Sequence, residues 1–434
     1  MTGMLRPDRV GCFDELRQGD GLSEIRLERA QARSAAAIQQ AIDSLGPHGG
    51  RLVLPAMELE LDRGIELRSN VTLVGQGRDT VLRKAKGRIY PLSGYHNYGM
   101  CDIPLMHTQG LVPGMTVAIR DDQHGGFFET LARITWVEDT WVGIDRGVHS
   151  DYTVEQNPVL VTAFPLIFGL GVSDVAVQGV TLDGNREAQP AGIGACRGAA
   201  LYFIGSRGIT VTDVTETGFA GEGLGFQMSR DVCIRDCLFA NNAGNGYHPG
   251  AGSTHVVFEN CIAEGNGAAG FFFCVRANHI SVRNCRFADN AGVGVSVGTR
   301  DSHNFLEACS IQGNGGAGIL FRRTRRPVEP QSCWVRDCRI EGNAHARGLG
   351  QIVVLGDAHD LAFEKNVISG LPDRDLPGFY VAPSAQRLWL ASNDISACSP
   401  AVVADPAAFV LENPVSGCGD EAVEAVHYRH LTPA

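Results

Sequence analysis

A repeat of 24 residues runs without a gap from Ser229 to Thr324, and no other feature of this sequence restricts the fold as strongly. Three residue types recur at fixed positions of the repeat: Cys237, Cys261, Cys285 and Cys309; Asn242, Asn266, Asn290 and Asn314; and Gly246, Gly270, Gly294 and Gly318. One copy is too short to bury its own apolar face, so the copies must stack, with about 4.8 Å between strands. The sequence therefore predicts an all-β fold, a right-handed parallel β-helix built from coils of about 24 residues.

The periodicity divides the 434 residues into four parts. Residues 1–86 hold the first coils and a cap helix, which the apolar spacing and the helix-forming residues predict over Ala32–Leu45. Residues 87–165 interrupt the coils with alternating stretches typical of a small inserted antiparallel β subdomain. The coils resume over residues 166–394, which carry the candidate groove, and residues 395–434 form a C-terminal tail or cap.

The columns of the repeat carry predictions of their own. The cysteine column is expected to hold small buried thiols that fill an inner row, rather than disulfides. The asparagine amides are expected to stack and to hydrogen-bond along the axis of the solenoid. No group of cysteines or histidines has the spacing of zinc ligands, so the sequence predicts no metal site and no cofactor, and it leaves a dependence on Ca²⁺ open.

Composition excludes several partners. The net charge of −11 comes without a cluster of basic residues, which argues against binding to nucleic acid. No stretch reaches the roughly 20 apolar residues of a membrane span, and the first residues lack the apolar segment of a secretion signal. We therefore expect a cytoplasmic protein with neither a nucleic acid nor a membrane as partner. Homo-oligomers stay open.

Alternation along a strand assigns the columns to faces, because successive side chains point to opposite sides. Two rows after the glycine column are apolar and should point inward. Polar and aromatic residues should point outward between or beside these rows: Tyr202, Glu222, Gln227, Asn245, His248, Phe272, Arg276, Arg300 and Arg322. They predict a shallow groove with aromatic and cationic walls, a shape that suits an extended polymer.

Histidine titrates near neutral pH, so His248 is the candidate acid or base of this face. The alternative is a surface histidine beside a turn. Glu222, Gln227 and Arg230 cluster one coil before His248. A solvated glutamate at a turn would be the ordinary outcome for Glu222.

Two further motifs have a structural and a functional interpretation. The segment Asp183–Arg186 reads as a turn whose Asp and Asn satisfy the backbone, although Asp183 or Arg186 could reach the groove. Arg276, Arg300 and Arg322 form a diagonal on consecutive coils. They are either solvated or a set of guanidinium forks for carboxylate or sulfate. The insertion at residues 323–330 (RTRRPVEP) is predicted to be a loop at the rim of the groove.

The segments AAIQQAIDSLGPHGGRLVLPA, SNVTLVGQG and VTLDGNR, together with the repeated coils, resemble the pectate-lyase-like β-helix superfamily. In detail they are similar to the catalytic modules of mannuronan C5-epimerases, over most of the chain outside the inserted subdomain. The Tyr-Gly-Phe-Asp-Pro-His signature of those enzymes is absent. Gly225, Phe226 and Gln227 stand where Asp-Pro-His is expected, while His248 and Pro249 occur one coil later in reversed order. The resemblance therefore implies a carbohydrate ligand without a specific activity.

Lyases and epimerases remove the proton next to a uronate carboxylate. They need a base, a cation on the carboxylate and an acid for a leaving oxygen. The sequence offers His248 as base, Arg276 or Arg300 as cation and Tyr202 as acid. The face has more arginines than carboxylates, which favours this chemistry on a uronate-containing polysaccharide or oligosaccharide.

Two alternatives stay open. A glycoside hydrolase needs two carboxyl groups about 5 to 9.5 Å apart, for which Glu222 and Asp183 are the candidates. A non-catalytic glycan-binding or structural β-helix would use the same aromatic and cationic face without turnover.

Overall fold

The computed structural model describes residues 23–190, 197–405, 408–412 and 423–425. Contacts divide these residues into two compact units. The N-terminal unit contains the described residues up to Gly225 and also residues 242–244, and the C-terminal unit contains the others from Phe226 onward. Among the described residues, no helix combines the length and the hydrophobicity needed to cross a membrane.

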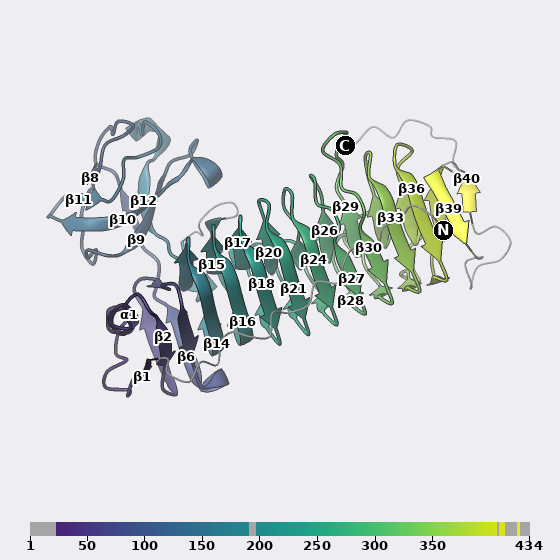
Figure 1. Cartoon of the computed structure of the whole chain (residues 1–434). Coiled ribbons are helices and arrows are strands. Elements are labelled where there is room, and N and C mark those ends of the chain that lie inside the picture. The colour runs from purple at the N-terminus through teal and green to yellow at the C-terminus, as the bar shows by residue number, and fades with distance from the viewer. Residues whose placement is uncertain (1–22, 191–196, 406–407, 413–422, 426–434) are drawn as a thin grey trace. The chain divides into compact units, whose positions relative to one another are not determined.

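The coils of the N-terminal unit are built from parallel strands in two sheets (Figure 1). The first sheet contains β1 (Glu24–Arg26), β2 (Gly50–Val53), β3 (Met57–Leu61), β5 (Val71–Val74), β6 (Thr80–Lys84), β14 (Ser173–Asp183) and β16 (Arg207–Thr217). The second contains β4 (Ile65–Glu66), β13 (Ile167–Leu170), β15 (Ala199–Ile204) and β17 (Glu222–Gln227), whose last two residues belong to the C-terminal unit.

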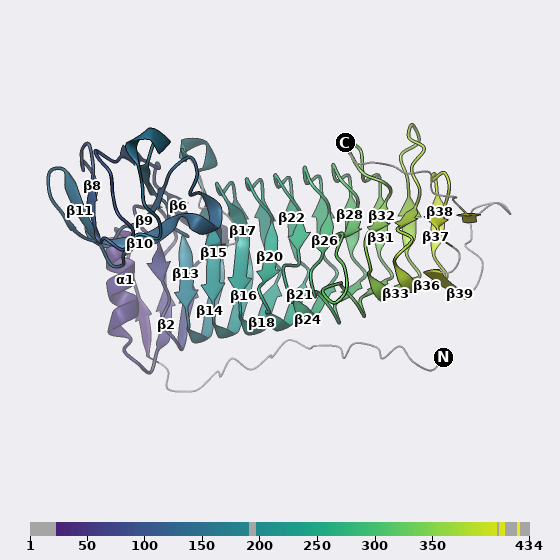
Figure 2. The same ribbon diagram turned by 90° about the horizontal axis from the view of Figure 1, so that it is seen from above.

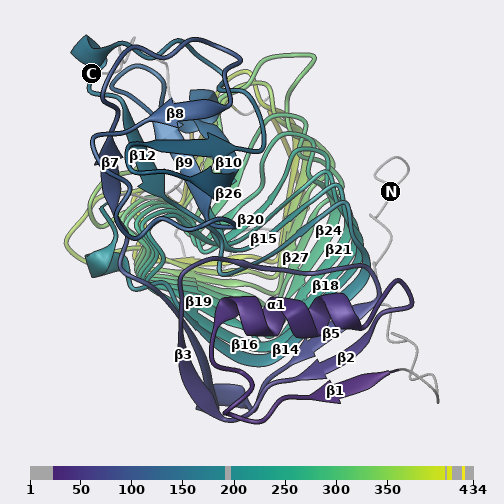
Figure 3. The ribbon, with the colours of Figure 1, turned by 90° about the vertical axis from the view of Figure 1, so that its left-hand side faces the viewer.

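The cap helix is present as α1 (Ala35–Ser44), within the predicted range. The Ser34 hydroxyl accepts a hydrogen bond of 3.1 Å from the Ala37 N–H and so closes the first turn. The helix buries Ile38 and Ile42 on one side. Figure 3 shows it lying across the first coils of this unit, where it covers apolar residues that an open solenoid end would expose.

Residues 89–162 leave the coils and form a six-stranded antiparallel sheet. Its strands are β7 (Ile89–Pro91), β8 (Asp102–Pro104), β9 (Thr116–Arg120), β10 (Thr130–Val137), β11 (Trp141–Ile144) and β12 (Val159–Thr162), in the order β7-β12-β9-β10-β11-β8. A bridge between Leu92 and Leu105 brings the two edges together. The inner side chains, among them Tyr90, Ile134 and Tyr152, form a separate hydrophobic core.

The C-terminal unit repeats the two-sheet coil, and its strands lie in parallel rows (Figure 2). One sheet contains β18 (Arg230–Arg235), β19 (Leu238–Ala240), β21 (Thr254–Glu259), β22 (Ile262–Glu264), β24 (Asn278–Arg283), β25 (Arg286–Ala288), β27 (Phe305–Glu307), β28 (Ser310–Gln312), β30 (Trp334–Arg336), β31 (Arg339–Glu341), β33 (His359–Glu364), β34 (Val367–Ser369), β36 (Gln386–Ala391), β37 (Asp394–Ser396) and β39 (Phe409–Glu412). The other contains β20 (Tyr247–Gly250), β23 (Phe271–Phe272), β26 (Val295–Val297), β29 (Ile319–Phe321), β32 (Ile352–Val354), β35 (Phe379–Val381), β38 (Val402–Ala404) and β40 (Val423–Ala425).

The 24-residue register is confirmed by the strand pairing. Val232 pairs with Val256, which pairs with Ile280, and Tyr247 pairs with Phe271, which pairs with Val295. These residues are almost completely buried, as the inward rows require. The sequence columns are therefore physical rows of side chains.

The asparagine column forms a buried ladder in the C-terminal unit. The Nδ2 of Asn266 donates to Oδ1 of Asn290 at 2.9 Å, and the Nδ2 of Asn290 donates to Oδ1 of Asn314 at 2.9 Å. Beyond the repeat, Asn343 and Gln351 continue the ladder. Each amide also bonds the backbone, so the prediction of a structural column is confirmed.

The cysteine column is confirmed as a row of thiols. Cys237, Cys261, Cys285 and Cys309 are buried, and none of the four forms a disulfide bond. The backbone N–H of Cys261 points at the sulfur of Cys285 from 3.4 Å, so the row follows the same stacking as the asparagines. Small apolar groups fill the inner corner of each coil.

Lys84, in the N-terminal unit, is a buried cation without a hydrogen-bond partner for its ammonium group. Its Nζ lies 3.3 Å from the ring centroid of Phe164. Burial lowers the pKa of Lys84 from 10.5 to about 7. The folded state therefore disfavours the charged amine, and this penalty is complete below about pH 7 and is relieved as the pH rises toward 10.5.

We expect Lys84→Met to raise the free energy of unfolding at pH 7 by a few kcal/mol, since each pKa unit is worth about 1.4 kcal/mol. Denaturant unfolding at pH 7 and pH 10 measures the effect, and the gain should shrink at pH 10. The exposed Lys86, in the Lys86→Met variant, is the matched control and should change little. A Lys84→Met protein less stable than the parent at pH 7 would show that the contact with Phe164 outweighs the cost of burial.

Candidate functional site

The outer face of the sheet formed by β20, β23, β26 and β29 carries the predicted residues of the C-terminal unit. His248 lies on β20 and Phe272 on β23, and the two rings meet edge to face with centroids 5.0 Å apart. Arg322, which directly follows β29, places its guanidinium carbon 4.3 Å from the centroid of Phe272. The structure thus brings His248, Phe272 and Arg322 together through one aromatic ring.

Arg322 reaches back across two coils. Its Nη1 donates to the Ser296 hydroxyl at 2.6 Å, and its Nη2 donates to the Phe273 carbonyl at 2.9 Å. The guanidinium lies against Gly298, where a Cβ atom would come within 2.1 Å of Nη2. Gly298 therefore keeps open the space that the arginine occupies, and the guanidinium lies flat on the sheet.

Asp301 is the counterion of Arg322 on this face. Its Oδ2 lies 3.4 Å from Nη2 of Arg322 and accepts the Gly298 N–H at 2.7 Å, and its Oδ1 accepts the Ala277 N–H at 3.0 Å. The carboxyl group is fully buried, and this burial raises its pKa to about 6 in spite of Arg322 and the nearby His248. Burial also lowers the pKa of Arg322, against the attraction of Asp301.

Gln227 is a buried amide with unmet hydrogen-bonding capacity. The side chain is 2% exposed, and neither its Oε1 nor its Nε2 has a partner among the described residues. The amide lies over Gly250, where a Cβ atom would come within 2.5 Å of Oε1. Gly250 shares strand β20 and its outer face with His248, so the amide belongs to the same surface.

The N-terminal unit holds a second group of predicted residues. Tyr202 lies on β15, is buried and packs against Phe168. Glu222, at the start of β17, is buried too. Oε2 of Glu222 and the ring of Tyr202 both lie within 4 Å of the position that a Cβ atom would take at Gly225. The structure therefore brings this carboxyl group and this phenol together over a glycine.

Asp183 and Arg186 come from other elements of the N-terminal unit. Asp183 ends β14, in the sheet with β16, whereas Tyr202 belongs to the other sheet of the unit. Its Oδ1 accepts the Asn185 N–H at 2.8 Å, and its Oδ2 pairs with Arg83 at 3.4 Å. Arg186 opens a 3-10 turn and is exposed. The turn interpretation of this segment accounts for these contacts.

Arg230 and Asn245 also have other surroundings. Arg230 lies on β18, in the sheet opposite to β20, and its guanidinium approaches Asp231 at 3.9 Å. Asn245 accepts the backbone N–H of Ala269 at 2.9 Å and so supports the next coil.

Arg276 and Arg300 occupy consecutive turns at the edge of the outer face. Both have positive φ, 69° and 57°, and both side chains are exposed. The insertion at residues 323–330 lies beside them, because the Arg300 N–H donates to the Val328 carbonyl at 3.0 Å. Arg323 and Arg325 of the insertion are exposed as well. This edge is a cationic rim on a protein whose net charge is −11.

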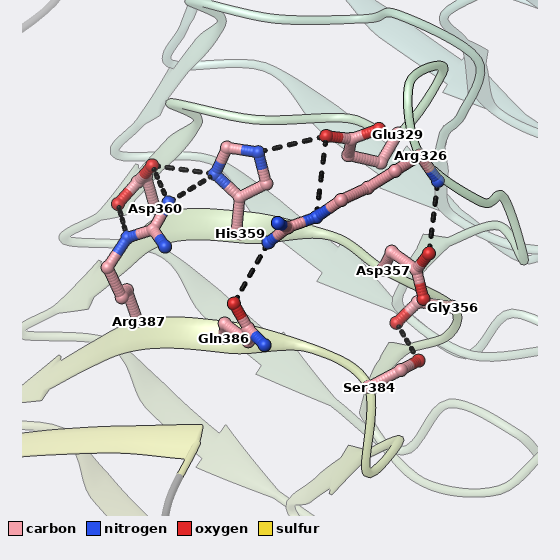
Figure 4. A network of polar contacts seen from close by, with 9 residues as sticks. All are labelled: Arg326, Glu329, Gly356, Asp357, His359, Asp360, Ser384, Gln386 and Arg387. Carbon is pink, nitrogen blue, oxygen red and sulfur yellow. Dashed lines mark hydrogen bonds and ion pairs between the residues drawn. The ribbon is translucent and has the colours of Figure 1, made fainter.

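A polar network holds the insertion against later coils (Figure 4). His359 lies between two carboxylates, with Nε2 3.1 Å from Glu329 of the insertion and Nδ1 2.6 Å from Asp360. Arg387 donates to both oxygens of Asp360 at 2.6 Å, and these bonds hold the pKa of Asp360 below its usual value. The network anchors one end of the rim.

The sequence prediction missed Asp301, which has the most buried carboxyl group of this face. The repeat contained a signal for it, because the equivalent positions in the preceding copies are Ser229, Ser253 and Ala277. At this position the preceding copies have a small residue. A carboxylate buried there needs a counterion. No group of three or more His, Cys, Asp or Glu side chains in the described part of the chain is arranged to hold a metal ion.

Comparison with known proteins gives the family and the fold. The family described as right-handed β-helix region matches residues 167–305 and 273–432. No curated protein sequence matches the chain. Among solved structures, the A-module of mannuronan C-5 epimerase AlgE4 from Azotobacter vinelandii has a TM-score of 0.54 at 18% identity, over 90% of this chain and 95% of that chain.

Two other structures have similar scores. The catalytic domain of a GH87 α-1,3-glucanase has a TM-score of 0.52 at 10% identity, over 93% of this chain and 69% of that chain. The N-terminal fragment of gene product 12 from bacteriophage Phi29 has a TM-score of 0.56 at 12% identity, over 87% of this chain and 62% of that chain.

At identities of 10–18% these likenesses show the fold and leave the activity open. The family matches span residues 167–432, which is more than half of the 434 residues. They agree with the parallel coils, the two-sheet cross-section and the 24-residue register described above. This chain belongs to the right-handed β-helix family.

Proposed function

We propose that this protein acts on a uronate-containing polysaccharide or oligosaccharide, by removing a proton next to the uronate carboxylate. The site is the outer face of β20, β23, β26 and β29 in the C-terminal unit. The cationic rim of Arg276 and Arg300 supports an anionic ligand, since guanidinium groups bind carboxylates with two hydrogen bonds. The low-identity likeness to an epimerase module supports a carbohydrate but not a particular reaction.

The observation that carries this proposal is the unpartnered amide of Gln227. Buried polar atoms nearly always have a hydrogen-bond partner, and a buried group without one costs about 1 to 3 kcal/mol. An amide offers one acceptor and two donor hydrogens, which matches the hydroxyl groups of a sugar. A sugar hydroxyl that bonded the amide would offset this cost, and because the side chain is 2% exposed, the groups that cover it must move aside when the sugar binds.

The same face contains a cation and a base for this reaction. Arg322 keeps N–H groups beyond those bonded to Ser296, Phe273 and Asp301, and these can bind the substrate carboxylate. His248 then takes the proton from the adjacent carbon, and the electron pair moves into the carboxylate, where Arg322 stabilises it. If the neighbouring glycosidic oxygen leaves, it takes a proton from protonated His248 or from water, and an unsaturated product forms. Return of a proton to the opposite side gives the epimer.

Proton exchange tests this proposal directly. The protein is incubated in D₂O with polymannuronate, polyguluronate and polygalacturonate. NMR then measures deuterium at the carbon next to the carboxylate, and absorbance follows the unsaturated product. Deuterium at that carbon, or a rise in the absorbance of an unsaturated product, supports the proposal, because elimination leaves that carbon without a hydrogen. New reducing ends with neither deuterium nor an unsaturated product would identify a hydrolase, and binding with none of these changes would identify a non-catalytic module. Both results contradict the proposed reaction.

The Asp301–Arg322 pair predicts the pH dependence of this activity. Because burial raises the pKa of Asp301 to about 6, its carboxyl group is neutral below that pH and charged above it. Only the charged form holds Arg322 in place by an ion pair, so kcat/KM should rise about tenfold per pH unit below pH 6 and level off above it. In Asp301→Asn the part of this rise that Asp301 contributes should be lost.

The pH affects the stability contribution of Asp301 in the direction opposite to its effect on activity. An unfolded aspartate has a pKa of about 3.9, so the folded protein binds the Asp301 proton more tightly. The contribution of Asp301 to stability is complete below about pH 4 and declines as the pH rises through about 6. Profiles of kcat/KM against pH for the parent and Asp301→Asn proteins check the prediction for activity. An unchanged profile in the variant would show that Asp301 does not contribute to the pH dependence.

A further inference from the structure

The inserted antiparallel subdomain carries most of the exposed large hydrophobic side chains of the described chain. Of the fourteen such side chains in the described residues, ten lie in residues 89–154. Two of the ten are tryptophans, Trp136 at 41% and Trp141 at 39% exposure. Exposed patches of this kind mark binding sites more often than packing defects, because soluble proteins seldom leave large aromatic rings in water.

Trp136 lies flat on the outer face of the subdomain. It pairs with Gly143 across strands β10 and β11. A Cβ atom at Gly143 would come within 1.9 Å of Nε1 and 2.3 Å of Cε2 of Trp136, so the indole occupies the space above the glycine. One face of the indole rests on the backbone of β11. Its 41% exposure leaves the other side open to solvent.

Trp141 extends the same surface along β11. It stands two residues before Gly143, so it points to the same side of the strand, about 7 Å away. Ile134, Val142 and Ile144 point to the opposite side, into the core. The outer face therefore presents two indoles at a spacing comparable to one or two sugar residues.

Carboxylates border the two indoles. Asp102 of β8 pairs with Gly143 on the outer side. Glu138 and Asp139 are exposed in the turn that joins β10 to β11. The basic residue of β10, Arg133, is held by Glu66 at 2.7 Å. The surface is thus aromatic and acidic, and the guanidinium of Arg133, which is 44% exposed, is paired with a carboxylate.

We propose that this surface, made by Trp136, Gly143, Trp141 and Asp102, is a second carbohydrate site that binds a neutral glycan. The negative face of an indole attracts the polarised C–H groups on the flat side of a pyranose. The neighbouring carboxylates accept hydrogen bonds from sugar hydroxyls, which strengthens bonds to neutral sugars. The same carboxylates repel a polyuronate, so charge selects a neutral chain. This site is independent of the proposed reaction, because it needs no catalytic group.

Binding measurements on the full chain test this proposal without requiring turnover. Isothermal titration uses cellohexaose, laminarihexaose and maltohexaose, with a mannuronate hexamer as the charged comparison. Acrylamide quenching of tryptophan fluorescence reports whether the exposed indoles become protected. We expect at least one neutral hexasaccharide to bind and to protect the indoles, and the mannuronate hexamer to give no protection.

Variants locate the site. Trp136→Ala and Trp141→Ala should each weaken binding of the neutral hexasaccharide at least tenfold. Gly143→Ala retains both tryptophans but displaces the indole of Trp136, so it should weaken binding as well. Gly94→Ala is the matched control, since a Cβ atom at Gly94 meets nothing within 4 Å, and it should bind like the parent.

Three results would overturn the proposal: no neutral hexasaccharide bound at millimolar concentration, binding unchanged in Trp136→Ala and Trp141→Ala, or equal protection by the mannuronate hexamer. Circular dichroism confirms that each variant is folded. Three separate substitutions are used, so misfolding of one variant leaves the other two to test the site. Since titration reads binding alone, a protein inactive on uronates still gives a clear answer here.

Discussion

Replacing His248 by alanine should lower kcat on a uronate polymer by about two to four orders of magnitude, because a positioned general base contributes that much. Binding of the polymer should change only a few-fold, since Gln227 and Arg322 remain. Stopped assays of deuterium exchange give kcat, and titration of an oligouronate gives the dissociation constant. The split between rate and affinity distinguishes a base from a binding residue.

His248 also packs against Phe272, so its loss could disturb the face without any chemical role. His255→Asn provides the matched control. His255 is an exposed histidine of the same repeat, lies on β21 in the other sheet and stacks on His279. This variant should keep full activity. If His248→Ala retains activity within threefold of the parent, the histidine is not the base.

Replacing Asn290 by alanine should have the largest effect on stability. Oδ1 of Asn290 accepts the side-chain and backbone N–H groups of Asn266 at 2.9 and 3.0 Å. Its Nδ2 donates to Asn314 at 2.9 Å and to the Ala263 carbonyl at 3.2 Å. Truncation leaves these buried partners without hydrogen bonds, at about 1 to 3 kcal/mol for each unsatisfied group. We expect a loss of about 3 kcal/mol or more.

A solenoid can unfold in segments, so the loss should be local. Hydrogen exchange measured by mass spectrometry should show faster exchange in the coils beside residue 290 than in distant coils. Gln312→Ala is the control, because that amide lies on the surface of the next coil and makes a single bond of 3.5 Å to Glu341. Equal protection in Asn290→Ala and in the parent protein would show that the ladder does not stabilise the coils.

The repeat made the fold predictable from the sequence. A strict 24-residue period leaves one register in which the cysteines, asparagines and glycines all align, and strand pairing follows that register. The inward rows were predictable for the same reason, since alternation and stacking fix the direction of each Cβ atom. The cap helix followed from its own apolar spacing.

The arrangement of the candidate site was only partly predictable. The position of His248 and Phe272 in one outward row follows from register. The path of Arg322 does not, because a side chain with four rotatable bonds can reach back two coils to the Phe273 carbonyl. Gly298 leaves room for the guanidinium, but this role can be assigned only once the position of the Arg322 side chain is known. Asp301 was missed for the same reason, because its role depends on the ion pair with Arg322.

Polar residues near turns were the least predictable. Asp183 and Asn245 were assigned to the groove because the sequence places them beside its rows, yet both satisfy backbone N–H groups nearby. Asp and Asn make such local bonds readily, so position alone cannot separate a capping residue from a ligand-binding one. Glu222 and Tyr202 do meet over Gly225, and their roles stay a prediction.

A crystal structure of the protein with a uronate hexasaccharide tests the central claim most directly. We expect a sugar chain on the outer face of β20, β23, β26 and β29. One carboxylate should lie within hydrogen-bonding distance of Arg322, and a hydroxyl should bond to the amide of Gln227. A hexasaccharide that binds only elsewhere, with Gln227 and Arg322 untouched, would contradict it.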